Sequence, residues 1–367
     1  MNKLGWIIVI SLGLLIPLGV TIVWLRQDDP APTIDPVQDH GATIVYGTPA
    51  CLEDALLWYS SGTLVYAPFN RPSTPIVAYP DVHPRAWQAV SAGTSAFHLV
   101  WLEENNQLRT ALISENGTTQ RGPIDLANGV QPAFTVLPFA QGSARLLWLD
   151  ASSASVLTAT LDPSGFPRSS SDPLLTQVAF VAAAADASQI AHLVWLVSPA
   201  TNQWSLLYQP SNAADLVADS PDTLLSFTLD AKETLTGLQI GLDSTHAYVL
   251  WSTVHTDQPD AERMFILTFP LDRSVSPTWS ELNLPVKLLR WPHVASGQHD
   301  TLPLALTVQT DNTWHPALVY FQNGALLRYK IRNSAPPADA GAPTLCHDQL
   351  FWLGLRGAVP HLFSATP

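Results

Sequence analysis

A short apolar segment built around a tryptophan recurs along the chain after residue 42. Its fullest form is FHLVWL at residues 97–102. The positions that mark its seven copies are Trp58, Trp101, Trp148, Trp195, Trp251, Thr307 and Trp352, with threonine replacing tryptophan in the sixth. These positions are 43 to 56 residues apart, a period typical of the four-stranded blades of a β-propeller. The repeat therefore indicates a single domain, although 367 residues would otherwise suggest two or three.

The apolar runs after residue 42 have the character of strands. They are 5 to 8 residues long, rich in Val, Leu, Trp and Tyr, and bounded by Gly, Pro, Asn, Asp and Ser. In the segment 97–102 both faces are apolar, with Leu99 and Trp101 on one and Val100 and Leu102 on the other. Such a strand needs a sheet that is covered on both sides, as a blade between two other blades is. We predict an all-β, seven-bladed β-propeller over residues 42–367, with six or eight blades as alternatives.

The last repeat is one strand short. Three apolar runs follow residue 341, whereas residues 42–46 (ATIVY) precede the first repeat without belonging to it. We predict that this N-terminal strand completes the last blade and so removes an exposed sheet edge. Cys51 and Cys346 lie seven and six residues before their tryptophans, in near-equivalent places of the first and last blades. We therefore predict a disulfide that locks the ring; two buried thiols are the alternative.

The N-terminal segment has the character of a membrane element. The run from Trp6 to Leu25 contains twenty residues without a charge, enough to cross a hydrocarbon core of roughly 30 Å. No small-x-small cleavage site ends the run, so an uncleaved transmembrane signal anchor over residues 1–26 is favoured over a signal peptide. Residues 27–41, with three prolines and four aspartates, are predicted to be a linker. The expected partner of residues 6–25 is the lipid bilayer, with the N-terminus cytoplasmic and the propeller extracytoplasmic.

Composition and motif content exclude several functions. The net charge is −13 and only 13% of residues are charged, so a surface that follows nucleic-acid phosphates is not expected. Two cysteines are too few for a thiolate zinc site, and the eleven histidines form no metal-binding motif. No nucleophile elbow or phosphate-binding glycine loop occurs either. The sequence therefore predicts no catalytic residues, no metal and no cofactor.

The order of strands and turns resembles the sialidase-like, BNR-type propeller repeats. The resemblance rests on HLVWL at 98–102 and 192–196 and on turns at Ser114–Gly117 and Asp162–Phe166. These turns fall where that family places its Asp-box, but the box (Ser-x-Asp-x-Gly-x-Thr-Trp) is degenerate in both. The resemblance implies a propeller fold and, as one possibility, a hydrolase or lyase that acts on glycans. It transfers no catalytic residue to this chain.

Loops on a rigid scaffold are common places for binding, so the turns between second and third strands are the expected working face. Its candidate residues are Glu103, Glu104, Asp150, Trp204, His255, Asp257, Asp260, Glu262 and Trp314. Solvated turns and packed indoles are the structural alternatives. Because no paired acid and base emerge, a module that binds a protein or an envelope carbohydrate is favoured over a glycan-acting enzyme.

Overall fold

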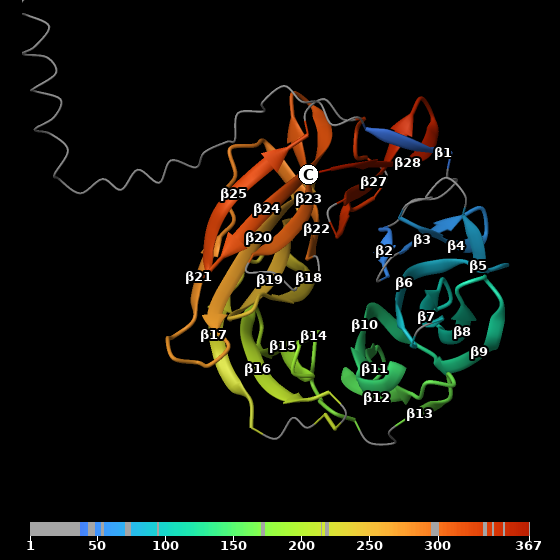
Figure 1. The fold of residues 1–367 in the computed structure, drawn as a ribbon. Helices are drawn as coiled ribbons and strands as arrows, with labels where there is room; N and C mark the ends of the chain where they lie inside the picture. Colours follow the sequence, from blue (N-terminus) through green and yellow to red (C-terminus); the bar gives the residue numbers. More distant parts are fainter. Residues whose placement is uncertain are drawn as a thin grey trace, which may run out of the picture.

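The computed structural model describes residues 37–366 except for 43–47, 53–54, 70–74, 94, 170–172, 214, 217–219, 295–300, 333–335, 340 and 348. These residues form seven four-stranded sheets arranged as blades around an axis (Figure 1). All pairings between neighbouring strands of a blade are antiparallel. The structure thus confirms an all-β, seven-bladed β-propeller.

The first three blades are consecutive in the sequence. Blade 1 consists of β2 (Ala50–Cys51), β3 (Ala55–Ser60), β4 (Thr63–Pro68) and β5 (Ile76–Tyr79). Blade 2 consists of β6 (Pro84–Ser91), β7 (Ala96–Glu103), β8 (Leu108–Ser114) and β9 (Thr119–Ala127). Blade 3 consists of β10 (Val130–Phe139), β11 (Ser143–Asp150), β12 (Ser155–Leu161) and β13 (Pro167–Ser169), with one 3-10 turn at Ala140–Gly142.

The remaining blades complete the ring. Blade 4 consists of β14 (Phe180–Ala185), β15 (Ile190–Ala200), β16 (Gln203–Asn212) and β17 (Asp222–Thr228). Blade 5 consists of β18 (Glu233–Leu242), β19 (His246–His255), β20 (Gln258–Pro270) and β21 (Thr278–Glu281). Blade 6 consists of β22 (Leu288–Val294), β23 (Leu302–Thr310), β24 (Thr313–Gln322) and β25 (Ala325–Ile331). Blade 7 consists of β26 (Thr344–Cys346), β27 (Gln349–Arg356), β28 (Val359–Ala365) and β1 (Gln38–Ala42).

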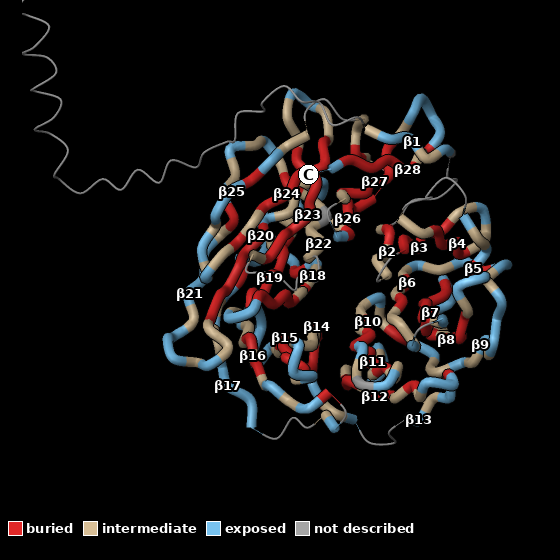
Figure 2. Tube along the Cα trace, viewed as in Figure 1, coloured by how far each residue is buried: buried red, intermediate tan, exposed pale blue. Residues whose placement is uncertain are grey.

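The tryptophan-marked segments are the second strands of the blades. Each marker residue lies in the second strand of its sheet and is at most 4% exposed, and Trp101, Trp352 and Thr307 are fully buried. Figure 2 shows these strands as buried, whereas exposed residues gather on the outermost strands and the turns. The hydrophobic clusters cross from blade to blade, as where Val100 and Leu102 of blade 2 pack with Trp148 of blade 3. Burial on both faces therefore explains why the alternating pattern of a half-exposed strand is missing.

An N-terminal strand completes blade 7, but it lies earlier in the chain than the sequence suggested. The strand is β1, which begins at Gln38, inside the segment 27–41 that the sequence assigned to a linker. Residues 43–46 of the expected strand 42–46 lie outside the described part of the chain. Asp39 holds β1 in place by accepting hydrogen bonds from Arg356 Nη1 at 2.7 Å and His361 Nδ1 at 2.9 Å. Long-range polar pairing thus selects a strand that local β-propensity does not mark.

The two cysteines join the first and last blades. Cys51 lies on β2 and Cys346 on β26, both first strands of their blades, and their Sγ atoms are 1.99 Å apart in a disulfide. Their Cα atoms are separated by 5.6 Å, and the bridge closes a loop of 295 residues. Blade 7 is thus tied to the start of the propeller twice, by β1 and by the disulfide.

Among the residues that the structure describes, no helix is long and apolar enough to cross a membrane. The uncharged run 6–25 lies outside those residues, so the transmembrane anchor stays a prediction.

Candidate functional site

The turns of the predicted working face are hydrogen-bonded to the linkers between blades. Glu104 N donates to His83 O at 3.0 Å, and Thr256 N donates to Lys232 O at 2.9 Å. Other blades repeat the arrangement: Ala151 N, for example, donates a hydrogen bond to Gly129 O in the linker between blades 2 and 3, at 2.9 Å. Much of this face therefore serves to join one blade to the next.

Glu103 is a structural residue and not an exposed binding group. Its residue surface is only 9% exposed. One carboxylate oxygen accepts the indole N–H of Trp101 at 2.7 Å, and the other accepts His83 N at 3.0 Å. Arg109 Nη1 lies 3.5 Å from the same carboxylate. The carboxylate thus satisfies a buried indole and fixes the linker that leads into blade 2.

Other predicted residues also have local roles. The carboxylate of Asp150 accepts hydrogen bonds from Ser152 and Ser153, and these bonds lower the pKa of Asp150. Asp257 accepts a bond from Lys232 Nζ at 2.9 Å, and His255 Nδ1 lies 3.7 Å from the same carboxylate. Trp204 is half-buried against the hydrophobic cluster between blades 4 and 5, whereas Glu104 is exposed.

Three predicted residues are grouped around an arginine that the sequence reasoning missed. The guanidinium of Arg290 lies 3.8 Å from the ring centroid of Trp314. Burial lowers the pKa of Arg290, and the negative charges of Asp260, Glu262 and Asp339 oppose that effect. The only sequence signal for this group is an arginine inside the apolar strand β22.

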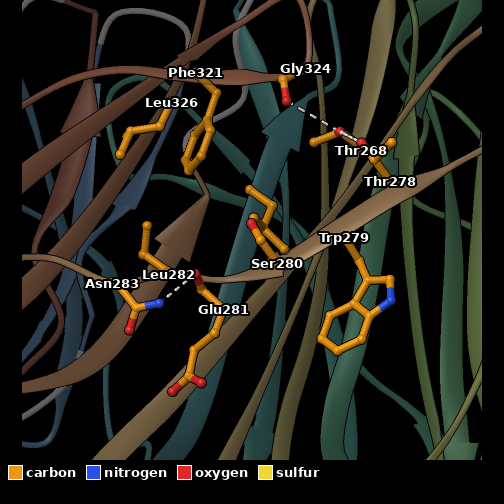
Figure 3. A pocket seen from close by; sticks show the side chains of 11 residues that line it. Thr268, Thr278, Trp279, Ser280, Glu281, Leu282, Asn283, Phe321, Gly324 and Leu326 are labelled. Atoms are coloured by element: carbon orange, nitrogen blue, oxygen red, sulfur yellow. Dashed lines mark hydrogen bonds between the residues drawn. The ribbon is translucent and has the colours of Figure 1, made fainter. Parts of the chain in front are cut away.

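A cleft lies between blades 5 and 6. Its volume is about 290 Å³, and it is lined by Ile266, Thr268, Thr278, Trp279, Ser280, Glu281, Leu282, Asn283, Phe321, Gly324 and Leu326. In Figure 3, Ser280 and Leu282 project to one side of β21, with Phe321 and Leu326 across from Leu282, whereas Trp279 and Glu281 project to the other side. This alternation follows the two-residue period of a strand.

A hydrogen-bonded chain of hydroxyl and backbone groups fixes one wall of the cleft. Thr268 Oγ1 lies 3.1 Å from Thr278 Oγ1 and donates to Gly324 O at 3.2 Å. Gly324 N in turn donates to Tyr248 Oη at 3.1 Å, and Tyr248 donates to the buried carboxylate of Asp243 at 2.5 Å. Gly324 has a φ of +79°, which favours glycine at this close approach. The wall is therefore preorganised.

The lining of the cleft carries a single ionisable side chain. Glu281 is the one ionisable residue among those that line the cleft. Hydrogen bonding from Arg263 lowers the pKa of Glu281, so this carboxylate stays ionised at neutral pH. General acid–base chemistry needs a second group to hold or release the proton, and the lining offers none. Within the described ranges, no group of three or more His, Cys, Asp or Glu residues is placed to hold a metal ion.

No protein-family model matches the sequence, and no curated protein is similar to it. Solved structures of the same fold do exist. The polysaccharide lyase Uly1 superimposes with a TM-score of 0.57 at 8% identity, covering 90% of this chain and 99% of the lyase. A lectin from Burkholderia pseudomallei gives 0.56 at 10% identity, covering 90% and 97%. An oligogalacturonate lyase gives 0.53 at 9% identity, covering 92% and 94%. At these identities the likeness shows the β-propeller fold alone.

The sequence reasoning did not find the cleft. The sequence analysis did not single out residues 278–283 (TWSELN), and their partners Phe321 and Gly324 are about 40 residues away. The alternation of Trp279 and Glu281 with Ser280 and Leu282 was the one local hint.

Proposed function

We propose that this protein is a membrane-tethered, extracytoplasmic binding module. The cleft between blades 5 and 6 holds part of a protein or of an envelope carbohydrate. The observation that carries the proposal is a rigid, hydroxyl-lined cleft with apolar walls and no acid–base pair. A volume of about 290 Å³ is near the lower end of small-molecule sites, which suits one sugar ring or one side chain.

Two further observations support this reading. The uncharged run 6–25 has the length of a membrane span, and the acidic chain disfavours nucleic acid as a partner. The lectin from Burkholderia pseudomallei is a binding protein on a propeller of the same fold. The two lyases are enzymes on that fold, so turnover of a glycan is the outcome that the experiment must exclude.

The cleft is tested by filling it. Ser280→Phe places a large ring in the cleft, and Ser226→Phe makes the same change on the exposed outer strand of blade 4. Full-length protein in mild detergent is tested against an array of neutral and acidic glycans and for co-purifying membrane proteins. We expect at least one glycan or protein to be retained by the wild type and by the Ser226 variant. We expect Ser280→Phe to weaken that binding by about tenfold or more.

Two results would contradict the binding proposal. One is cleavage of any arrayed glycan by the wild type, seen as new reducing ends or unsaturated products. The other is binding that Ser280→Phe leaves unchanged. The tether is tested separately by deleting residues 1–26, which should move the protein from the membrane fraction to the soluble fraction. An intact chain found in the soluble fraction would refute the anchor.

A further inference from the structure

Strand β21 has a second face, opposite to the one that carries Ser280 and Leu282. Its residues Trp279 and Glu281 are also among those that line the cleft. Trp279 and Glu281 project from this face (Figure 3), and Trp279 contacts Trp251 and Phe265 of the same blade. We call the group formed by Phe227, Trp251, Phe265, Trp279 and Arg263 the aromatic edge. Its residues lie on β17 of blade 4 and on β19, β20 and β21 of blade 5.

The aromatic edge is built on a stacked column. The guanidinium of Arg263 lies 5.1 Å from the ring centroid of Phe265. Phe265 stacks on Trp251 with centroids 5.4 Å apart and planes at 13°, and Trp251 stacks on Phe227 at 5.5 Å and 26°. The column therefore runs from blade 5 to blade 4 and holds each ring in one orientation.

Trp279 is the solvent end of this group. It is 52% exposed, and it is the one tryptophan among the exposed large hydrophobic side chains of the described residues. Its ring contacts Trp251 at 6.2 Å and 45° and Phe265 at 6.3 Å and 54°. An indole fixed from below by two buried rings loses little further freedom when a ligand lies on it, so it is a preorganised platform.

Charged groups beside the platform limit what it can bind. Arg263 donates from Nε and Nη2 to the two carboxylate oxygens of Glu281, at 3.0 and 2.9 Å, and from Nη1 to Glu233. One cation therefore serves two carboxylates, which leaves a net charge of about −1 on the group. The side chain of Glu281 is still 33% exposed, so its oxygens can accept further bonds from solvent or ligand.

We infer that the aromatic edge is a second ligand site, on the face of β21 opposite to Ser280 and Leu282, and that its ligand is a neutral sugar. A pyranose has a face of C–H groups that can lie on the indole of Trp279 and a rim of hydroxyls that can donate to Glu281. A uronate or a sialic acid would bring a carboxylate against a cluster that already carries excess negative charge. The net charge of −13 on the whole chain also disfavours an anionic sugar.

The site is tested with small glycosides. Full-length protein in a detergent without a sugar headgroup is titrated with the methyl glycosides of glucose, galactose and mannose and with methyl glucuronide. Tryptophan fluorescence and saturation-transfer NMR report binding. We expect at least one neutral glycoside to bind and to change the fluorescence, whereas methyl glucuronide does not.

Variants separate this site from the cleft. Trp279→Ala should weaken binding of the neutral glycoside by roughly tenfold or more, and Trp279→Phe by less because stacking is kept. Glu281→Gln should weaken binding as well. Val359→Ala, which shortens an exposed apolar side chain on blade 7, should change nothing. Ser280→Phe should also leave the neutral glycoside bound, so loss of the cleft function and loss of this site are distinguished.

The inference is overturned if no neutral glycoside binds to the wild type. It is also overturned if Trp279→Ala binds the glycoside as the wild type does, or if methyl glucuronide binds equally well. Circular dichroism of each variant checks that the propeller is folded.

Discussion

Replacement of Glu103 by alanine is expected to destabilise the propeller without affecting a ligand. Glu103 was predicted to be a binding residue, but its carboxylate is buried and accepts hydrogen bonds from Trp101 and His83. The neighbouring Glu104 is exposed, so Glu104→Ala is a matched control at the same turn.

The magnitude follows from the two donors that alanine would leave. Trp101 is fully buried, so its indole N–H would have no water to replace the lost charged acceptor, at a cost of about 1.5 to 3 kcal/mol. His83 is exposed, and its backbone N–H can recover a bond to water. Arg109 keeps its bond to Asp125 at 2.9 Å. The expected loss in the free energy of unfolding is therefore roughly 2 to 3 kcal/mol, against less than about 0.5 kcal/mol for Glu104→Ala.

Urea unfolding, followed by circular dichroism, measures both variants. Glu103→Gln keeps one acceptor oxygen and should lose about 1 kcal/mol. A double-mutant cycle with Trp101→Phe, which removes the indole N–H, should give a coupling energy of about 1 kcal/mol or more. The reasoning is refuted if the Glu103 and Glu104 variants unfold at the same urea concentration, or if the cycle shows no coupling.

Two further predictions concern the closure of the ring and its dependence on pH. Replacing Cys51 and Cys346 together by serine removes a disulfide that closes a loop of 295 residues. In the chain-entropy model this should lower the free energy of unfolding by up to roughly 5 to 6 kcal/mol. Equal unfolding midpoints for the oxidised protein and the double variant would contradict this prediction. Burial lowers the pKa of His192, and that of His293 to about 4, so the unfolded chain takes up protons on these imidazoles at higher pH than the folded chain. The melting temperature should therefore fall as the pH is lowered from about 7 to about 4, and it should fall less steeply in the His293→Asn variant. A melting temperature that does not change over this pH range would refute the prediction. The pKa of Asp39 is lowered to about 2, so the contribution of its ionised carboxylate to the free energy of unfolding is lost only at more acidic pH.

The repeat predicted most of the fold because each blade obeys a local rule. A strand that is apolar on both faces requires cover on both faces, and the spacing of Trp58, Trp101 and Trp148 repeats that requirement along the chain. The strand that completes blade 7 was harder to predict. Residues 42–46 have the higher β-propensity, but Asp39 in the preceding segment finds Arg356 and His361 more than 300 residues away.

The candidate sites were less predictable than the blades. The sequence placed Asp260, Glu262 and Trp314 on loops, but it did not indicate that Arg290 would lie among them. It also treated Glu103 as a candidate binding residue on a turn, although its carboxylate accepts the indole N–H of Trp101 two positions earlier.

The sequence by itself determined the propeller class, the buried second strand of each blade and the acidic character of the chain, and it favoured seven blades over six or eight. These properties depend on the spacing of the repeats and on the residue composition, which the sequence gives directly. Only the tertiary structure decided that Ser280 and Leu282 lie on one side of β21 and that Trp279 packs against Trp251 on the other. The reason is that the blades packed beside a strand determine what each of its two faces contacts. The cleft arises where blade 5 meets blade 6, and the aromatic edge where blade 5 meets blade 4, at contacts between residues that are distant in the chain.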